Sequence, residues 1–164
     1  MRAENSLAIK MTQAIKLTTD QIRLISLFQK ITKTTARDCL DDENQNKIIF
    51  VVNEGKMGLA IGKGGSNIKS LQNILKRNVE LVEYFADPIK FLKNVLNSKL
   101  INEVKLDTKQ DGSSQATVIV DQGKKGLVVG REGRNAERAR LFAKRYFDIS
   151  SVQITSPTVT QLEM

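Results

Sequence analysis

The sequence predicts an α+β protein built from two copies of one structural unit. A shift of 68 positions places GKMGLAIGKGGSN, residues 55–67, on GKKGLVVGREGRN, residues 123–135. A run of β-branched residues precedes each copy, and a segment with apolar residues at helical spacing follows it. Because an internal repeat reports on domain organisation directly, we expect the 164 residues to form two small domains.

The first copy is expected to run helix, strand, strand, short helix, glycine loop, helix, strand. Its first helix lies in TTDQIRLISLFQKIT, with Thr19 or Asp20 as the N-cap. The three strands are expected at residues 36–40, 48–52 and 79–84. The helix sides expected to face the core carry Ile22, Ile25, Leu27, Phe28 and Ile31 before the loop and Ile68, Leu71, Ile74 and Leu75 after it.

The second copy repeats this order. Its first helix lies in DPIKFLKNVL, with Asp87 as the N-cap and Pro88 at the first helical position. Strands are expected at residues 104–106, 117–120 and 151–155, and KQDGSSQ is expected to form the turn between the first two. The helix after the second loop has an apolar side made of Ala136, Ala139, Phe142, Ala143 and Tyr146.

These patterns divide the chain into two domains with short additions. The expected limits are an N-terminal extension at residues 1–17, domains at 18–87 and 88–156, and a C-terminal tail at 157–164. Met11 is an alternative start, because nothing before it has a periodic pattern. The junction at residues 86–88 has no Gly/Ser-rich linker.

Composition restricts the classes of function. Lys and Arg number 26 against 18 Asp and Glu, which gives a net charge of +8 and favours a polyanionic partner such as nucleic acid or an anionic membrane. No run approaches the roughly 20 apolar residues that cross a bilayer, and no signal peptide is evident, so we expect a cytoplasmic protein.

Histidine is absent and Cys39 is the single cysteine, which excludes a His/Cys zinc site, a Ser-His-Asp triad and a Cys-His pair within one chain. Carboxylate-based or Lys-based catalysis stays open, but no acidic pair stands out. We therefore expect no enzymatic activity, no metal and no cofactor, and we expect Cys39 to be a small buried strand residue.

The two glycine loops are candidate phosphate-binding sites. A G-x-x-G loop at a helix N-terminus offers backbone N–H groups at the positive end of the helix dipole. A nucleotide-binding P-loop would need G-x-x-x-x-G-K-[ST], and a dinucleotide fold would need G-x-G-x-x-G after a strand; neither copy has either pattern. A turn without a ligand is the remaining alternative.

The segments IGKGGSNI, residues 61–68, and VGREGRNA, residues 129–136, resemble the I-G-x-x-G-x-x-I signature of KH domains, whose loop clamps about four nucleotides of single-stranded nucleic acid. The helix and strand before the shared core resemble the prokaryotic, type II, KH topology. The match extends from about Leu17 to Thr155, occurs twice, and includes phrases such as RDCLDDENQNKIIFVVNEGKMGLAIGKGGSNIK. On these residues the chain is similar to the archaeal NusA-like transcription factors.

The resemblance implies two tandem type II KH domains, each a three-stranded sheet covered by helices. It also implies binding of single-stranded RNA in transcription elongation or termination, with RNA polymerase or other transcription factors as possible partners and no membrane partner. A structural or ribosome-associated component, whose KH domains serve as a scaffold, is the alternative.

The same resemblance assigns candidate RNA-binding residues in both loops, although a solvated helix face is the simpler role for any single cation. The apolar residues Leu59, Ile61, Ile68, Leu127 and Val129 are expected in the groove floor or, for most of them, in the core. Ala136 replaces the large aliphatic residue of the signature, so the second floor is expected to be shallower or to be built by Leu141 and Phe142. The expected RNA-binding residues are Lys56, Gly62, Lys63, Gly64, Gly65 and Lys69 in the first domain, and Lys124, Lys125, Gly130, Arg131, Glu132, Gly133, Arg134 and Arg138 in the second.

Overall fold

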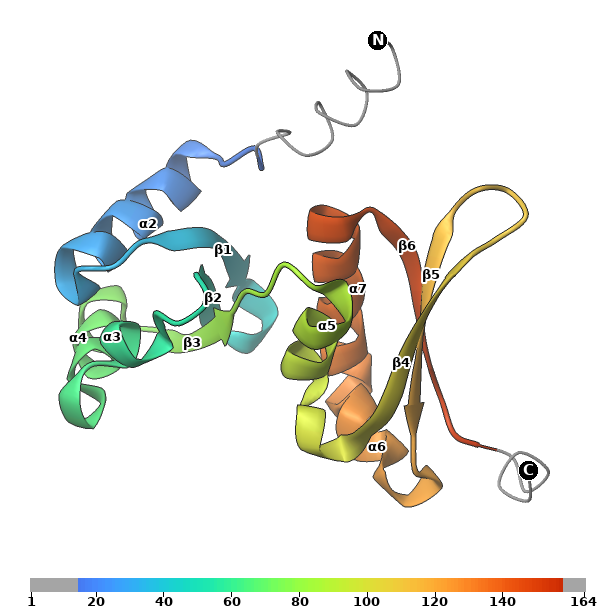
Figure 1. Cartoon of the computed structure of the whole chain (residues 1–164). Helices are drawn as coiled ribbons and strands as arrows, with labels where there is room; N and C mark the ends of the chain where they lie inside the picture. Colours follow the sequence, from blue (N-terminus) through green and yellow to red (C-terminus); the bar gives the residue numbers. More distant parts are fainter. Residues whose placement is uncertain (1–14, 158–164) are drawn as a thin grey trace, which may run out of the picture. The chain divides into compact units, whose positions relative to one another are not determined.

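The computed structural model describes residues 15–157 (Figure 1). Most of the expected N-terminal extension, including Met11, and nearly all of the expected C-terminal tail lie outside this range. The described residues form two compact units, one made of residues 15–52 and 58–81 and the other of residues 53–57 and 82–157. Each unit has helices and a three-stranded sheet, which confirms the predicted α+β class.

The first repeat contains the predicted elements in the predicted order. They are α2 (Thr19–Thr32), β1 (Ala36–Asp42), β2 (Lys47–Val52), α3 (Met57–Ile61), α4 (Ser66–Leu75) and β3 (Asn78–Glu83). The strand order is β1-β2-β3, and β1 pairs with β2 in antiparallel register, with Cys39 opposite Phe50. A short 3₁₀ turn, Lys63–Gly65, forms the glycine loop between α3 and α4.

The second repeat has the same order of elements. They are α5 (Pro88–Leu96), β4 (Ile101–Thr108), β5 (Ser114–Val120), α6 (Lys125–Val129), α7 (Arg134–Phe147) and β6 (Ile149–Thr155). The central strand β5 is antiparallel to β4 and parallel to β6. The strand β4 is longer than the predicted residues 104–106. Only two of its residues, Ile101 and Val104, are buried, so its sequence shows little of the hydrophobic alternation from which a strand is predicted.

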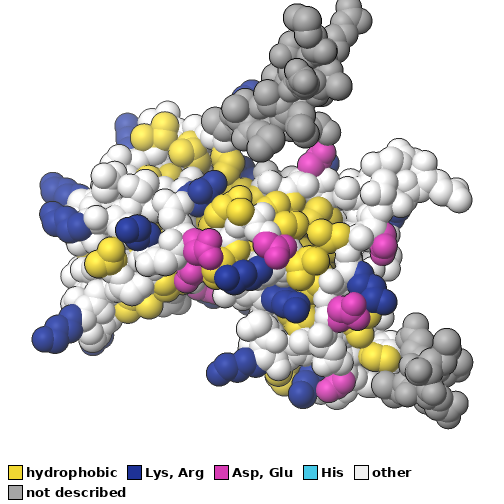
Figure 2. All heavy atoms as spheres, viewed as in Figure 1, with side chains coloured by type: hydrophobic (Ala, Val, Ile, Leu, Met, Phe, Trp, Pro, Cys, Tyr) yellow, Lys and Arg dark blue, Asp and Glu magenta, His cyan; other side chains and the backbone are white. Residues whose placement is uncertain are grey.

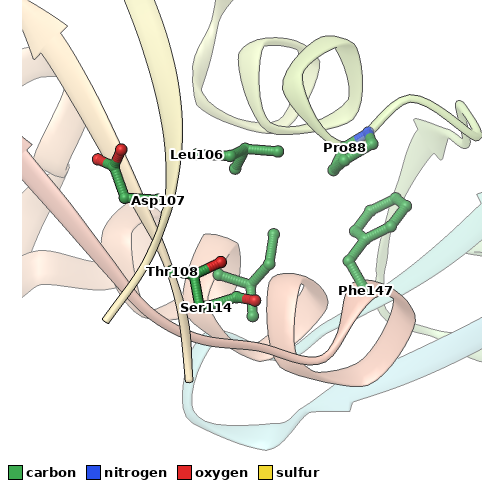
Figure 3. Close-up of a pocket in the computed structure, with 7 residues that line it drawn as sticks. Pro88, Leu106, Asp107, Thr108, Ser114 and Phe147 are labelled. Carbon is green, nitrogen blue, oxygen red and sulfur yellow. The ribbon is translucent and has the colours of Figure 1, made fainter. Parts of the chain in front are cut away.

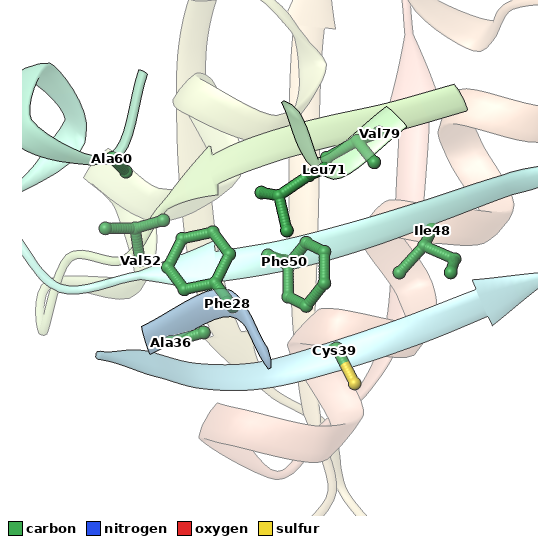
Figure 4. Close-up of a cluster of buried hydrophobic side chains, with 9 residues drawn as sticks. All are labelled: Phe28, Ala36, Cys39, Ile48, Phe50, Val52, Ala60, Leu71 and Val79. Atoms are coloured by element: carbon green, nitrogen blue, oxygen red, sulfur yellow. The ribbon is translucent and has the colours of Figure 1, made fainter. Parts of the chain in front are cut away.

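The core of the first unit lies between its sheet and its helices (Figure 4). Phe28 of α2 packs on Phe50 of β2 with 4.7 Å between ring centroids, and Leu71 of α4 joins them. Cys39 is fully buried in β1, as expected, and its Sγ donates to the carbonyl oxygen of Gln21 at 3.7 Å. One face of the sheet is therefore closed by residues from all three helices.

The second unit has an aromatic core. The buried rings of Phe91 in α5 and Phe142 in α7 lie 5.7 Å apart, centroid to centroid. Tyr146 packs against both rings, at 5.6 and 5.5 Å respectively. Tyr84, which follows β3, contacts Phe91 at 5.7 Å. The apolar side predicted for the second long helix is confirmed, since Ala136, Ala139, Phe142 and Ala143 are all buried.

Two details of the helices correct the sequence prediction. The N-cap of α2 is Thr18, one residue before Thr19, because Gln21 completes a capping box only from there: the Thr18 hydroxyl accepts from the Gln21 amide and the Gln21 side chain accepts from the Thr18 amide. Ile22 and Ile74, expected in the core, are 52% and 56% exposed. At 3.6 residues per turn, Ile74 points about 100° away from Leu75 and leaves the buried stripe.

A half-buried arginine, Arg77, holds the end of the first sheet together. Arg77 pairs with Asp41 and donates to the carbonyl oxygens of Asp42 and Lys47 at 3.3 and 3.2 Å. The hydrogen bond to Asp41 raises the pKa of the Arg77 guanidinium. The turn between β1 and β2 is thereby tied to the start of β3.

Candidate nucleic-acid interface

The two glycine loops have the same backbone conformation. Their (φ, ψ) values are (78°, 168°), (62°, 22°) and (75°, 17°) at Gly62, Gly64 and Gly65. The equivalent values at Gly130, Glu132 and Gly133 are (82°, 169°), (58°, 25°) and (74°, 14°). The chain therefore follows one path twice, although the middle residues differ in type.

The first glycine of each loop is required by its dihedral angles and by its neighbours. A φ near 80° with ψ near 170° is a region that only glycine adopts without strain. A β-carbon at Gly62 would lie 2.8 Å from the side chain of Asn67, and one at Gly130 would lie 2.7 Å from the side chain of Asn135. Another residue at either position would displace the asparagine.

Asn67 is a positioning residue, and neither it nor its equivalent Asn135 is among the expected RNA-binding residues. The Asn67 side-chain amide donates to the carbonyl oxygen of Leu59 at 3.0 Å, so it ties the helix after the loop to the short helix before it. The signal was in the sequence, because Asn67 and Asn135 coincide in the repeat.

The loop amides divide into bonded and open groups. The amides of Gly62 and Gly65 donate to the carbonyl oxygens of Gly58 and Gly62, each at 3.1 Å. The equivalent pairs at Gly130 and Gly133 are 3.0 and 3.1 Å long. The four bonds do not use the amides of the two middle residues, and the second of these, Gly64 or Glu132, has a left-handed, non-helical conformation. Successive N–H groups in such a turn form a concave anion-binding site, so each loop can offer two adjacent N–H groups to an anion.

An exposed leucine precedes each loop at equivalent positions. Leu59 in α3 is 59% exposed and Leu127 in α6 is 67% exposed, whereas Ala60 and Val128 next to them are buried. Of the two roles expected for these residues, the core is therefore excluded for both leucines, and the groove floor stays a prediction: a five-residue helix turns only one of its residues fully into the core. Ile61, Ile68 and Val129 are half-buried.

The expected contribution of α7 to the second groove is only partly possible. Ala136 is buried, and Phe142 is enclosed in the aromatic core, so Phe142 cannot form a surface floor. Leu141 is 48% exposed.

The expected cations of the two loops differ in their partners. Within residues 15–157, Lys56, Lys63 and Lys69 of the first loop are exposed and form no ion pair. In the second, the side chains of Lys124 and Arg134 pair with Asp121 and Glu132, at 3.7 and 3.2 Å. Figure 2 shows Lys and Arg side chains at several separate places on the visible face, not in one continuous patch.

The remaining expected cations surround the second loop. Arg131 is exposed, Lys125 is half-buried, and a guanidinium nitrogen of Arg138 lies 3.5 Å from Asn135 Oδ1. Lys56 and Lys124 lie directly before the short helices, and all the other expected site residues belong to a short helix, its loop or the first turns of the next helix.

A cavity of about 220 Å³ in the second unit lies apart from the candidate interface (Figure 3). It is lined by Pro88, Leu106, Asp107, Thr108, Ser114, Phe147 and Ile149, and none of these is an expected RNA-binding residue. Among the described residues, no group of His, Cys, Asp and Glu side chains could hold a metal ion, and no helix is long and apolar enough to span a membrane.

Two units with this order of elements and a G-x-x-G loop between two helices define a protein with tandem KH domains. The comparisons agree. Residues 22–85 match the KH domain family. The chain is 36% identical to the probable transcription termination protein NusA of Halobacterium salinarum, covering 86% of this chain and 99% of that protein.

A second relative and a solved structure match the same share of the chain. The protein of the same name from Methanocaldococcus jannaschii is 32% identical over 85% of this chain and 75% of its own length. The crystal structure of APE1850 superposes with a TM-score of 0.74 at 37% identity, covering 85% of this chain and all of the other. The chain belongs to the archaeal NusA-like family of KH-domain proteins.

Proposed function

We propose that this protein binds single-stranded RNA through both glycine loops and acts, without catalysis, in transcription termination or elongation. The archaeal relatives carry the name of a transcription termination protein, and the KH domain is an RNA-recognition module. The observation that carries the proposal is the nearly equal backbone conformation of the two loops, because a connector without a ligand would not need the same unusual path twice.

Each loop can hold a phosphate without a large side chain. The amides of Lys63 and Gly64 are adjacent in a turn that contains a left-handed residue, a backbone arrangement that forms concave anion-binding sites. Gly64 and Gly65 have open space where a β-carbon would be, so a nucleotide backbone can approach the chain closely. Lys56 and Lys63 add charge that releases counterions from the strand.

The exposed leucines supply an apolar surface next to each phosphate site. Leu59 and Leu127 stand in the short helix directly before the loop, where the bases of a clamped strand would lie. No aromatic residue occurs between residues 51 and 83 or between 121 and 141, so stacking platforms of the kind found in other RNA-binding modules are missing from these segments. Bases are therefore recognised through aliphatic contact and hydrogen bonds to their edges.

Two loops on one chain would cooperate. An RNA strand held by one loop is presented to the other loop at a high effective concentration. The affinity of the whole chain therefore exceeds the sum of the affinities of the two separate loops. RNA polymerase and other transcription factors are proposed partners that a pull-down from an archaeal extract would test.

The test places two aspartates at the middle positions of each loop, which reverses the charge of Lys63 and Arg131. Lys63→Asp with Gly64→Asp, combined with Arg131→Asp and Glu132→Asp, should abolish binding of a labelled unstructured RNA in fluorescence anisotropy. The circular-dichroism melt should show only the small shift caused by a side chain at the left-handed position of Gly64, because all four positions are exposed. Wild-type affinity in this variant would refute the proposal.

The matched control is a chain with Lys30→Glu and Lys99→Glu, which lie outside both loops and are exposed. It should lose only the non-specific electrostatic part of the binding. The scaffold alternative predicts that the wild-type chain binds folded RNA but not the short unstructured RNA.

A further inference from the structure

The second loop contains a negative charge where the first has none. Glu132 occupies the position of Gly64, with nearly the same φ and ψ. The left-handed conformation is uncommon for a residue with a side chain. The difference between the loops at this point is therefore chemical and not conformational.

Glu132 is engaged with a cation of its own loop. Its Oε2 lies 3.2 Å from a guanidinium nitrogen of Arg134, and the two side chains are 70% and 41% exposed. Arg134 is one of the expected phosphate ligands, and a carboxylate presents the same two-oxygen edge to a guanidinium as a phosphate does. In the first loop the position of Arg134 is occupied by Ser66, so no such pair can form there.

The surrounding charges strengthen the contrast. Residues 53–70 contain three Lys and one acidic residue, and residues 121–138 contain five Lys and Arg and three acidic residues, so both segments carry a net charge of +2. The single acid of the first segment, Glu54, pairs with Lys90 outside the segment. In the second segment two acids, Asp121 and Glu132, pair with cations of the same segment. The larger number of cations is thus offset within the second segment itself.

We propose that Glu132 competes with RNA phosphate for Arg134 and so makes the second loop the weaker of the two RNA-binding loops. This inference rests on the proposed RNA-binding function. An incoming phosphate must break the Glu132–Arg134 pair before it can bind Arg134, whereas the lysines of the first loop are open to it. The RNA strand then binds first to the first domain, and binding to the second domain strengthens the complex.

The test measures the second loop in a full-length chain whose first loop is inactivated by Lys63→Asp and Gly64→Asp. The probe is a fluorescein-labelled random-sequence RNA of about 12 nucleotides, roughly three times the length that one loop clamps. In this background, Glu132→Gln should raise the affinity about three- to fivefold, the factor that corresponds to the upper range for an exposed ion pair. The slope of log Kd against log salt concentration should steepen by about 0.7, as for one more phosphate contact.

The matched control is Glu137→Gln, which removes the same charge from an exposed position on α7. It should raise the affinity less than Glu132→Gln does. In a chain with Arg134→Gln, the effect of Glu132→Gln should shrink to that of the control, because the competed cation is absent. An effect no larger than that of Glu137→Gln, or a loss of affinity, would overturn the inference.

A reciprocal change tests the same idea in the first loop. In a chain whose second loop is inactivated by Arg131→Asp and Glu132→Asp, Ser66→Arg should strengthen binding, and adding Gly64→Glu should reverse most of that gain. A gain that survives Gly64→Glu unchanged would contradict the inference. Failure of the wild-type chain to bind the probe would instead reject the proposed function, and the inference with it.

Discussion

The helices after the two loops begin alike and are buried differently. Ile74 of α4 and Phe142 of α7 are equivalent in the repeat, yet Ile74 is 56% exposed and Phe142 is fully buried between Phe91 and Tyr146. The loops before these helices nevertheless have the same dihedral angles. The loop conformation is therefore encoded by its own glycines and asparagine and does not depend on the core beneath it.

The largest expected effect tests this difference in burial. Phe142→Ala should lower the free energy of unfolding of the second unit by about 3–5 kcal/mol, because it empties a packed aromatic site. Ile74→Ala should change the stability of the first unit by no more than about 0.5 kcal/mol, because the side chain is mostly in water. Urea unfolding measures both, and equal losses would show that the two helices are buried alike.

The next effect tests the similarity of the loops. Gly62→Ala and Gly130→Ala should each cost about 2–3 kcal/mol, since both positions combine a glycine-only conformation with a clash against an asparagine. Gly64→Ala, with open space around its β-carbon, should cost only about 1 kcal/mol. Thermal melts followed by circular dichroism compare the three variants.

A double variant separates the clash from the backbone strain. Asn67→Ala removes the side chain that a β-carbon at Gly62 would meet, so Gly62→Ala should cost less in that background. The same cost in both backgrounds would mean that the dihedral angles alone require the glycine.

A smaller effect compares the caps of the first helix in each repeat. The Thr18 hydroxyl accepts from the Gln21 amide, and Asp87 Oδ1 accepts from the Ile89 amide at 2.9 Å. Thr18→Ala and Asp87→Ala should each cost about 1 kcal/mol in their own unit. Thr19→Ala, one residue inside the first helix, should cost clearly less in the same urea titration. A larger loss of stability in Thr19→Ala than in Thr18→Ala would instead identify Thr19, one of the two caps predicted from the sequence, as the N-cap.

The smallest effect concerns the strand turns. In the first repeat Asp42 accepts from the Gln45 amide at 3.2 Å; in the second, Asp111 accepts from both the hydroxyl and the amide of Ser113, at 2.6 and 2.9 Å. The hydroxyl bond of Ser113, followed by its amide bond, lowers the pKa of Asp111 from the ordinary 3.8.

Because the folded pKa of Asp111 is depressed, this stabilisation is present above the ordinary pKa and is lost as the pH falls through the folded value. Ser113→Ala should raise the pKa of Asp111 toward 3.8, which a carboxyl-detected NMR titration would measure. If the pKa of Asp111 did not change in Ser113→Ala, neighbours other than Ser113 would be responsible for its lowered value.

Much of the fold and of the loops could be predicted from neighbouring residues. The repeat, the order of elements, the Asp87 cap with Pro88, and the position of both G-x-x-G loops follow from periodicity and local backbone preference. The cap of α2 was missed by one residue, because Thr18, Thr19 and Asp20 are all good caps and only the contact with Gln21 distinguishes them.

The positions of other residues were decided by packing, which the sequence left open. Leu59 and Leu127 have core-like side chains, but the short helices that contain them turn Ala60 and Val128 inward. Phe142 was considered for the groove and lies instead against Phe91, fifty-one residues earlier in the chain. Hydrophobicity indicates that burial of such side chains is favourable, and only the packing of the folded chain shows which of them are buried.

The sequence by itself determined two α+β units and two glycine loops at helix starts. Those properties belong to adjacent residues, since glycine alone adopts the dihedral angles of Gly62 and Gly130 and apolar spacing defines a helix side. Only the tertiary structure decided that a leucine stays exposed before each loop and that Glu132 binds Arg134. These outcomes depend on which side chains the folded chain brings within contact, and that is a matter of three-dimensional packing.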